Sequence, residues 1–182
     1  MSYDAPRHQQ QDLLRACGTL LILAAPVRPP KPSPGQPGVV SEYLQAHDDV
    51  FVAVSEQGWV RAFHGHVDLG TGIQTALSQI VADELDVSMA RVQMVLGHTD
   101  AVPNQGPTIA SASIQIHAVP LRKAAAQARQ LLLAQAAQRW TLPADQLRVD
   151  DGTVIAPDGR SLTYWQLLEG QELRAYLDKE TP

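Results

Sequence analysis

The chain has 182 residues, of which 45% are hydrophobic and 18% charged, and its formal net charge is −5. These values are typical of a globular domain with its own core, and they exclude wholesale disorder. Aromatic residues make up only 5% of the chain and no basic stripe appears, so nothing indicates nucleic-acid binding. The single cysteine, Cys17, excludes an internal disulfide framework and indicates a reducing compartment such as the cytoplasm. A periplasmic or membrane-associated complex is the alternative.

Residues 1–38 are predicted to form a leader and a spacer, followed by the main domain at residues 39–182. The apolar run Gly18–Val27 is too short to span a bilayer, and it lacks the basic region that precedes the apolar part of a signal peptide. We expect Gly18–Ala25 to be a strand or an interface segment, with a signal peptide as the alternative. The stretch Arg28–Gly38 is proline-rich, as is typical of an extended spacer.

A β-hairpin and an amphipathic helix are predicted next. Residues Val50–Val54 alternate as a strand, Glu56–Gly58 form a turn, and Trp59–Leu69 continue as a second strand. The pattern then changes to helical periodicity over Gly72–Leu85. One face of this helix carries the apolar residues Ile73, Leu77, Ile80, Val81 and Leu85.

A further strand and a long helix follow. Val92–Leu96 is predicted to be a strand, and an alanine-rich helix occupies about Ser113–Trp140, with Pro120 either near its start or kinking it. The alanines of this helix indicate close packing against another element.

The last part of the chain predicts a hairpin and a short helix. The hairpin covers Leu147–Ile155 around Asp151-Gly152, and Thr163 with Gln166 forms a capping box that opens a helix over Tyr164–Glu169. The order of elements predicts an α+β fold, in α/β layers, with a mixed β-sheet packed by two main helices.

The first candidate site is the strand–helix junction around Gly70, Thr71 and Gly72. Glycines at a helix N-terminus let a ligand approach backbone N–H groups, and the helix dipole there favours an anion such as phosphate. The alternative is a plain tight turn, in which Thr71 and Gln74 form a capping box.

The second candidate is the loop Pro103–Ser113, "PNQGPTIASAS", just ahead of the long helix. The hydroxyls of Thr108, Ser111 and Ser113 can donate to an anion, and the alanines admit a flat ligand at close range. A polar loop with Ser113 as the N-cap is the alternative.

Histidines form the third candidate. His64 and His66 are predicted on one face of a strand, with Asp68 following and His98-Thr99-Asp100 elsewhere. Two histidines and a carboxylate could hold Zn²⁺, although the spacing matches no known metal signature and such residues often face solvent.

Two segments together carry a family resemblance: "GHVDLGTGIQTALSQIVADELDV" and "RVQMVLGHTDAVPNQGPTIASASIQ", with an alanine-rich helix behind them. They resemble the N-terminal portion of the molybdopterin-binding large subunit of the xanthine dehydrogenase and aldehyde oxidase family, isoquinoline 1-oxidoreductase and nicotinate dehydrogenase type. In that family the first junction is usually Gly-Gln-Gly, whereas Thr71 stands at the glutamine position here. The cofactor-binding residues that the resemblance implies are Gly70, Thr71, Gly72, Pro107, Thr108, Ala110, Ser111 and Ser113.

The resemblance also implies a cofactor, a reaction and partners. The cofactor is molybdopterin-bound molybdenum, with a cytosine dinucleotide form as one option, and the reaction is hydroxylation of an N-heteroaromatic or aldehyde substrate with water. The expected partners are the remaining molybdopterin-binding domains and an iron–sulfur subunit. The family's catalytic glutamate motif is absent from this sequence, so no catalytic residue is assigned, and we expect a chain that is inactive alone and exposes apolar surface for self-association.

Two further hypotheses remain open at this point. One is a non-catalytic small domain that binds a phosphate-bearing ligand or a protein partner, and the other is a metal hydrolase built on His64, His66 and Asp68.

Overall fold

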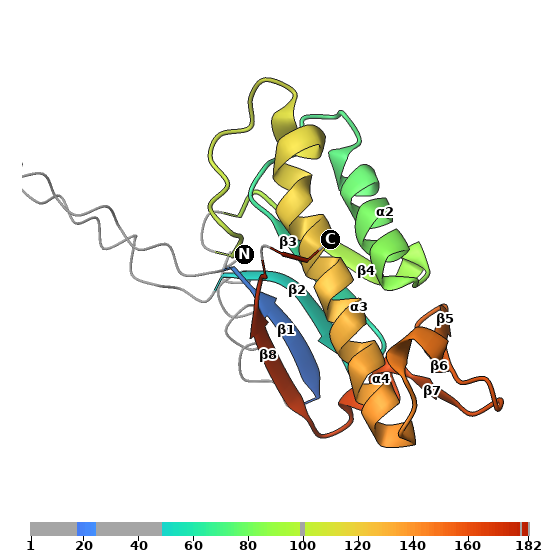
Figure 1. Ribbon diagram of the computed structural model, residues 1–182. Coiled ribbons are helices and arrows are strands. Elements are labelled where there is room, and N and C mark those ends of the chain that lie inside the picture. Colours follow the sequence, from blue (N-terminus) through green and yellow to red (C-terminus); the bar gives the residue numbers. More distant parts are fainter. Residues whose placement is uncertain (1–17, 25–48, 99–100, 179, 182) are drawn as a thin grey trace, which may run out of the picture.

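In the computed structural model, a five-stranded mixed sheet carries two long helices on one face, with a small three-stranded sheet beside them (Figure 1). The structure describes residues 18–24, 49–98, 101–178, 180 and 181. The predicted proline-rich spacer Arg28–Gly38 and Cys17 lie outside the described residues. No helix in the described part of the chain has the length and apolar character needed to cross a membrane.

The large sheet has the strand order β4-β3-β2-β1-β8. The central strands pair antiparallel, β1 with β2 and β2 with β3, whereas the edge strands β4 and β8 run parallel to β3 and β1. The strands are β1 (Thr19–Leu23), β2 (Val50–Ser55), β3 (Val60–His64), β4 (Val92–Leu96) and β8 (Glu172–Tyr176). All five residues of β1 are buried and pair with β2 and β8, so the predicted strand is confirmed.

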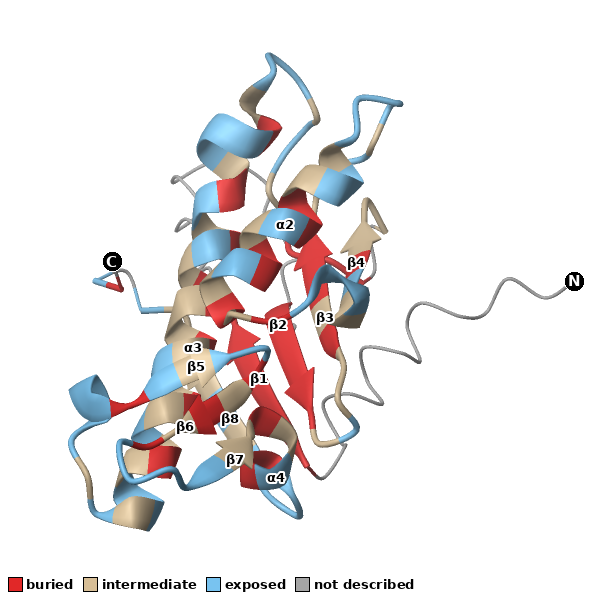
Figure 2. Ribbon diagram, turned by 90° about the vertical axis from the view of Figure 1, so that its right-hand side faces the viewer, coloured by how far each residue is buried: buried red, intermediate tan, exposed pale blue. Residues whose placement is uncertain are grey.

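The main core lies between this sheet and the helices α2 (Ile73–Leu85) and α3 (Ala118–Trp140). The apolar stripe predicted for α2 faces inward, and Figure 2 shows β1, β2 and β3 almost entirely buried. The predicted close packing of α3 is confirmed, because small side chains let it approach the sheet and α2. Its fully or nearly fully buried alanines are Ala118, Ala124, Ala125, Ala128 and Ala136.

Shorter elements complete the fold. Three single turns are η2 (Met89–Arg91), η3 (Ser113–His117, a π-helical turn that runs into α3) and η4 (Ala144–Gln146). The small antiparallel sheet is formed by β5 (Arg148–Asp150), β6 (Thr153–Ile155) and β7 (Ser161–Thr163), and it leads into α4 (Tyr164–Leu168).

Two local predictions at the C-terminal end are confirmed. Asp151 and Gly152 both have positive φ, 40° and 70°, which is the backbone that a tight hairpin turn between β5 and β6 requires. At α4, the Thr163 hydroxyl accepts from the Gln166 N–H and the Gln166 side chain accepts from the Thr163 N–H, so the capping box is present.

The structure differs from the sequence predictions in one strand boundary and in two additional strands. Strand β3 ends at His64 and not at Leu69, because the chain turns at Gly65 to meet the loop that precedes α3. Strands β7 and β8 were not predicted. β8 is an edge strand with exposed Glu172 and Arg174, and it becomes a strand through its pairing with β1 at the other end of the chain.

Candidate functional site

The two loops that were singled out in the sequence lie together at one end of the sheet, at the top of Figure 1. We call residues 65–72 the first junction and residues 103–113 the second junction. The Gly65 N–H donates to Gln105 Oε1 at 2.8 Å, and the Val67 N–H donates to Thr108 Oγ1 at 3.1 Å. The junctions are therefore hydrogen-bonded to each other, although they come from two distant parts of the sequence.

The helix that follows the first junction is capped by a residue that the sequence analysis did not assign to it. Asp68 Oδ1 accepts from the N–H groups of Gly70, Thr71 and Gly72 at 2.9, 2.9 and 3.2 Å, and its Oδ2 accepts from the Gln74 N–H at 3.1 Å. These hydrogen bonds hold the pKa of Asp68 below its usual value, and the bond from the Gln74 N–H has the largest effect. The carboxylate also complements the positive end of the helix dipole.

The predicted capping box at Thr71 and Gln74 is therefore wrong. Gly72 is the N-cap residue, with φ +77° and no side-chain cap of its own, and its left-handed backbone lets the chain curl over the Asp68 carboxylate. The N–H groups that were predicted to be open to an anion already donate to the Asp68 carboxylate. A phosphate at this helix terminus is disfavoured.

The exposed part of the first junction is mainly glycine backbone without side chains. Gly70 and Gly72 both have positive φ, and a Cβ at either would meet nothing within 4 Å. The Thr71 side chain is exposed, and its hydroxyl lies 3.4 Å from Asp68 Oδ1, at the long limit of a hydrogen bond. Leu69 beside them is 75% exposed. This surface fits the close approach of a flat, partly apolar group.

The second junction is held under backbone strain. Ala110 and Ser111 are exposed and both have left-handed φ, +56° and +54°. Each such non-glycine residue costs about 1–2 kcal/mol, and conformations of this kind cluster at functional sites. Pro107 is also exposed in this loop.

Two predicted site residues anchor the second junction to the first. Thr108 accepts from the Val67 N–H, and Ser113 is buried with its Oγ 2.7 Å from His66 Nδ1. Ser113 does not cap the long helix as the alternative proposed, because it already lies within the π-helical turn η3. Of the predicted set, the exposed members are Gly70, Thr71, Gly72, Pro107, Ala110 and Ser111.

The zinc hypothesis fails on geometry. His64 and His66 are both fully buried, and Asp68 points away from them to the start of α2. Within the described residues no group of three or more potential ligands could hold a metal ion. The sequence analysis also noted His98, Thr99 and Asp100. His98 is described, whereas Thr99 and Asp100 lie outside the described residues.

Burial has a clear effect on His64. Desolvation, with His66 nearby, lowers its pKa from 6.5 to about 4, while the backbone of His117 acts in the opposite direction. The His66 N–H donates to His64 Nδ1 at 3.2 Å, which leaves the proton of the neutral ring on Nε2. No hydrogen-bond partner for Nε2 is found in the described part of the chain.

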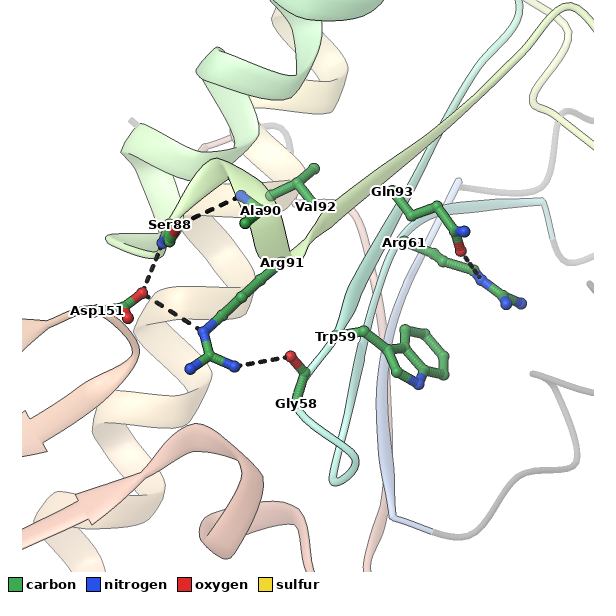
Figure 3. A pocket seen from close by; sticks show the side chains of 9 residues that line it. All are labelled: Gly58, Trp59, Arg61, Ser88, Ala90, Arg91, Val92, Gln93 and Asp151. Atoms are coloured by element: carbon green, nitrogen blue, oxygen red, sulfur yellow. Dashed lines mark hydrogen bonds and ion pairs between the residues drawn. The ribbon is translucent and has the colours of Figure 1, made fainter.

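A separate open pocket of about 850 Å³ lies near the start of β3 and β4, whereas the junctions follow the end of β3 (Figure 3). Arg61 lies over the Trp59 ring and donates to Gln93, while Arg91 donates to the Gly58 carbonyl. None of the predicted site residues lines this pocket.

The fold and the paired junctions define an α+β domain with two hydrogen-bonded loops at one end of a mixed sheet. Residues 29–181 match the family model of the molybdopterin cofactor-binding domain, and the chain belongs to this family. The resemblance to the molybdopterin-binding subunits of the xanthine dehydrogenase and aldehyde oxidase family is thereby confirmed.

Two curated relatives illustrate the similarity. Over 180 residues the chain is 49% identical to a nicotinate dehydrogenase component of Pseudomonas putida, a match that covers 96% of this chain and 15% of that protein. Over 129 residues it is 37% identical to the beta chain of isoquinoline 1-oxidoreductase from Brevundimonas diminuta, covering 66% of this chain and 16% of that protein. The chain thus spans about one sixth of the length of these relatives.

Solved structures show the same fold. CO dehydrogenase from Oligotropha carboxidovorans superposes with a TM-score of 0.56 and 24% identity, over 62% of this chain and 14% of that one. Quinoline 2-oxidoreductase from Pseudomonas putida 86 gives a TM-score of 0.54 and 22% identity, over 64% and 15% of the two chains. The predicted α+β fold with a mixed sheet and two main helices is confirmed.

The exposed junction residues fit a molybdopterin-type cofactor as one wall. Bare glycine backbone and small side chains allow a flat group to lie close, and the exposed Ser111 hydroxyl can donate to it, whereas the Thr71 hydroxyl donates to Asp68. The two junctions and the helix behind them also expose large apolar side chains. These are Val67, Leu69, Ile109, Ile114, Ile116 and Val119.

Proposed function

We propose that this chain supplies one wall of the cofactor site in a molybdenum hydroxylase. The observation that supports the proposal is that the two junctions are hydrogen-bonded to each other, while Gly70, Gly72, Ala110 and Ser111 on them are all exposed. When bound, the cofactor supplies the two-electron oxidation of a substrate carbon, with water as the source of the new oxygen. The junction backbone would hold the cofactor, and the exposed apolar side chains would exclude water once the cleft is closed.

Thr71 would make a different contact from the glutamine that is usual in the family. A hydroxyl on a shorter side chain retains one donor and one acceptor but loses the amide's reach. We therefore propose that Thr71 approaches the cofactor through its hydroxyl, and that Gly70 and Gly72 provide backbone contact on either side.

The names of the relatives support the substrate class. Nicotinate dehydrogenase and isoquinoline 1-oxidoreductase are both named for N-heteroaromatic compounds. We propose an N-heteroaromatic substrate, with an aldehyde as the alternative, and a cytosine dinucleotide form of the cofactor. The partners would be the remaining molybdopterin-binding domains and an iron–sulfur subunit, in the cytoplasm or in a periplasmic or membrane-associated complex. Alone, the chain would be inactive.

The non-catalytic phosphate-binding domain is the weaker candidate. It relied on free N–H groups at the start of α2, and those of Gly70, Thr71 and Gly72 are taken by the Asp68 carboxylate. A phosphate there would meet a negative charge and would have to displace it.

Co-expression tests the proposal. The chain is produced with the neighbouring reading frames, and molybdenum and pterin are measured in the purified complex. Ala110→Leu should abolish cofactor retention while the chain still folds, because it adds bulk at an exposed position. Ala144→Leu, at an exposed alanine in η4, is the matched control and should retain the cofactor. If no complex with any neighbouring product contains molybdenum, the proposal is overturned.

A further inference from the structure

Four hydrogen-bonding contacts connect the two junctions, one from Val67 to Thr108 and three that involve His66 or Gln105. His66 places Nδ1 at 2.7 Å from Ser113 Oγ and Nε2 at 3.4 Å from the Gln105 carbonyl. Gln105 accepts from the Gly65 N–H at 2.8 Å and donates to the His117 carbonyl at 2.7 Å. We call His66, Gln105 and Ser113 the junction bridge.

With a neutral His66 ring, the bridge has one consistent arrangement of protons. The Gln105 carbonyl can only accept, so His66 donates from Nε2 and receives the Ser113 hydroxyl proton at Nδ1. Gln105 is oriented by its two partners, since Oε1 must accept from Gly65 and Nε2 must donate to His117. The His66 ring is fully buried and lies 4.2 Å from that of His117, centroid to centroid.

The bridge explains why the strained loop persists. Ala110 and Ser111 lie between two anchors, Thr108 on the Val67 N–H and Ser113 on His66. A left-handed non-glycine pair survives only where its surroundings over-determine it. The approach is close, because a Cβ at Gly65 would come within 2.5 Å of the Pro103 carbonyl oxygen.

We infer that His66 and Gln105 are positioning residues, which hold the strained part of the second junction at a set distance from Gly70 and Gly72. His66 is buried and Gln105 is half-buried, whereas Ala110 and Ser111 are exposed. We infer that this fixed distance keeps the shape of the cofactor-binding wall constant, and this part of the inference rests on the proposed function. The bridge itself does not depend on it.

Three variants separate hydrogen bonding from space filling. His66→Ala removes the contacts of His66 to Ser113 and to the Gln105 carbonyl, whereas His66→Asn places an amide oxygen near the position of Nδ1 and keeps an acceptor for Ser113. Gln105→Glu keeps the size of the side chain, retains the acceptor for Gly65 and sets a carboxylate oxygen against the His117 carbonyl. Tyr164→Phe is the control, since it removes a buried hydrogen bond to the Leu85 carbonyl away from the junctions.

The first readout is hydrogen exchange of the junction amides in the full chain, after circular dichroism has confirmed folding. We expect Val67 and Ala112 to exchange about tenfold faster or more in His66→Ala and Gln105→Glu, as local opening becomes easier. His66→Asn should stay within about threefold of wild type, and Tyr164→Phe should leave these amides unchanged. Wild-type exchange in both disruptive variants would overturn the bridge. Equal acceleration in His66→Asn and His66→Ala would show that the ring only fills space.

The second readout is molybdenum and pterin content of the co-expressed complex. Content should fall several-fold in His66→Ala and Gln105→Glu and should be retained in His66→Asn and Tyr164→Phe. Faster exchange with unchanged cofactor content would overturn the positioning role and leave only a structural bridge. A wild-type complex without molybdenum would overturn the proposed function and with it the positioning role, while the exchange data would still decide whether the bridge exists.

Discussion

The buried His64 should make the stability of this chain strongly dependent on pH. Its side chain is fully buried, and burial lowers its pKa to about 4, against about 6.5 in the unfolded chain. As the pH falls below about 6.5, His64 becomes protonated in the unfolded state but stays neutral in the folded state. The free energy of unfolding therefore decreases. This contribution is therefore fully present above pH 6.5, is lost as the pH falls towards 4, and levels off below that.

The magnitude follows from the two pKa values. Their difference corresponds to about 3 kcal/mol in full, of which about 2 kcal/mol is lost between pH 7 and pH 5. The free energy of unfolding is measured by urea titration across this range, with the fluorescence of the tryptophans as the signal. His64→Asn is the comparison, because its amide oxygen can still accept from the His66 N–H and the side chain does not titrate.

The difference between the two pH profiles reports His64 together with its coupling to His66 and His117, since the remaining titratable groups are common to both proteins. The wild-type profile should fall more steeply than that of His64→Asn by about 2 kcal/mol. Parallel profiles would refute the reasoning, because they would mean that His64 binds its proton equally well in both states.

Three other substitutions test separate parts of the structure. Asp68→Ala should lower the melting temperature by about 3 °C and reduce the helical signal, because four N–H groups at the start of α2 lose their acceptor. The same cap should weaken in acid: the folded pKa of Asp68 is depressed, so its contribution is present above the unfolded pKa and is lost as the pH falls through the folded one. Tyr164→Phe should cost about 1–2 kcal/mol in urea unfolding, since the Leu85 carbonyl loses a buried partner at 3.0 Å. Ala110→Gly should raise the free energy of unfolding by about 1 kcal/mol through relief of the left-handed strain, and an unchanged or lower value would contradict the strain.

Elements with a local pattern were predictable from the sequence. The apolar stripe of α2, the small-residue face of α3 and the Asp151-Gly152 turn depend on residues within one or two turns of chain. The same holds for the α4 capping box, where donor and acceptor are three positions apart. The glycine- and hydroxyl-rich character of both junctions was also visible, because it lies in the residue types themselves.

The wrong predictions share one cause: another side chain, not considered in the sequence analysis, makes the hydrogen bonds in question. Thr71 and Gln74 satisfied the spacing of a capping box, yet the carboxylate of Asp68 is a stronger acceptor and reaches the same N–H groups. Asp68 was considered only as a metal ligand, although its place just before Gly70 and Gly72 was a usable signal for a cap. Gln105 carried no signal at all in the sequence.

The sequence by itself determined the helices, the hairpins and the composition of a surface on which a flat cofactor could lie. The tertiary structure decided which of those residues are exposed and which are anchors. His66 meets Ser113 across 47 positions and Gly65 meets Gln105 across 40, and β8 becomes a strand by pairing with β1. Burial and pairing of this kind depend on which distant segments come together, and no local periodicity encodes that, so Ser113 points inward while Ser111, two residues earlier, faces out.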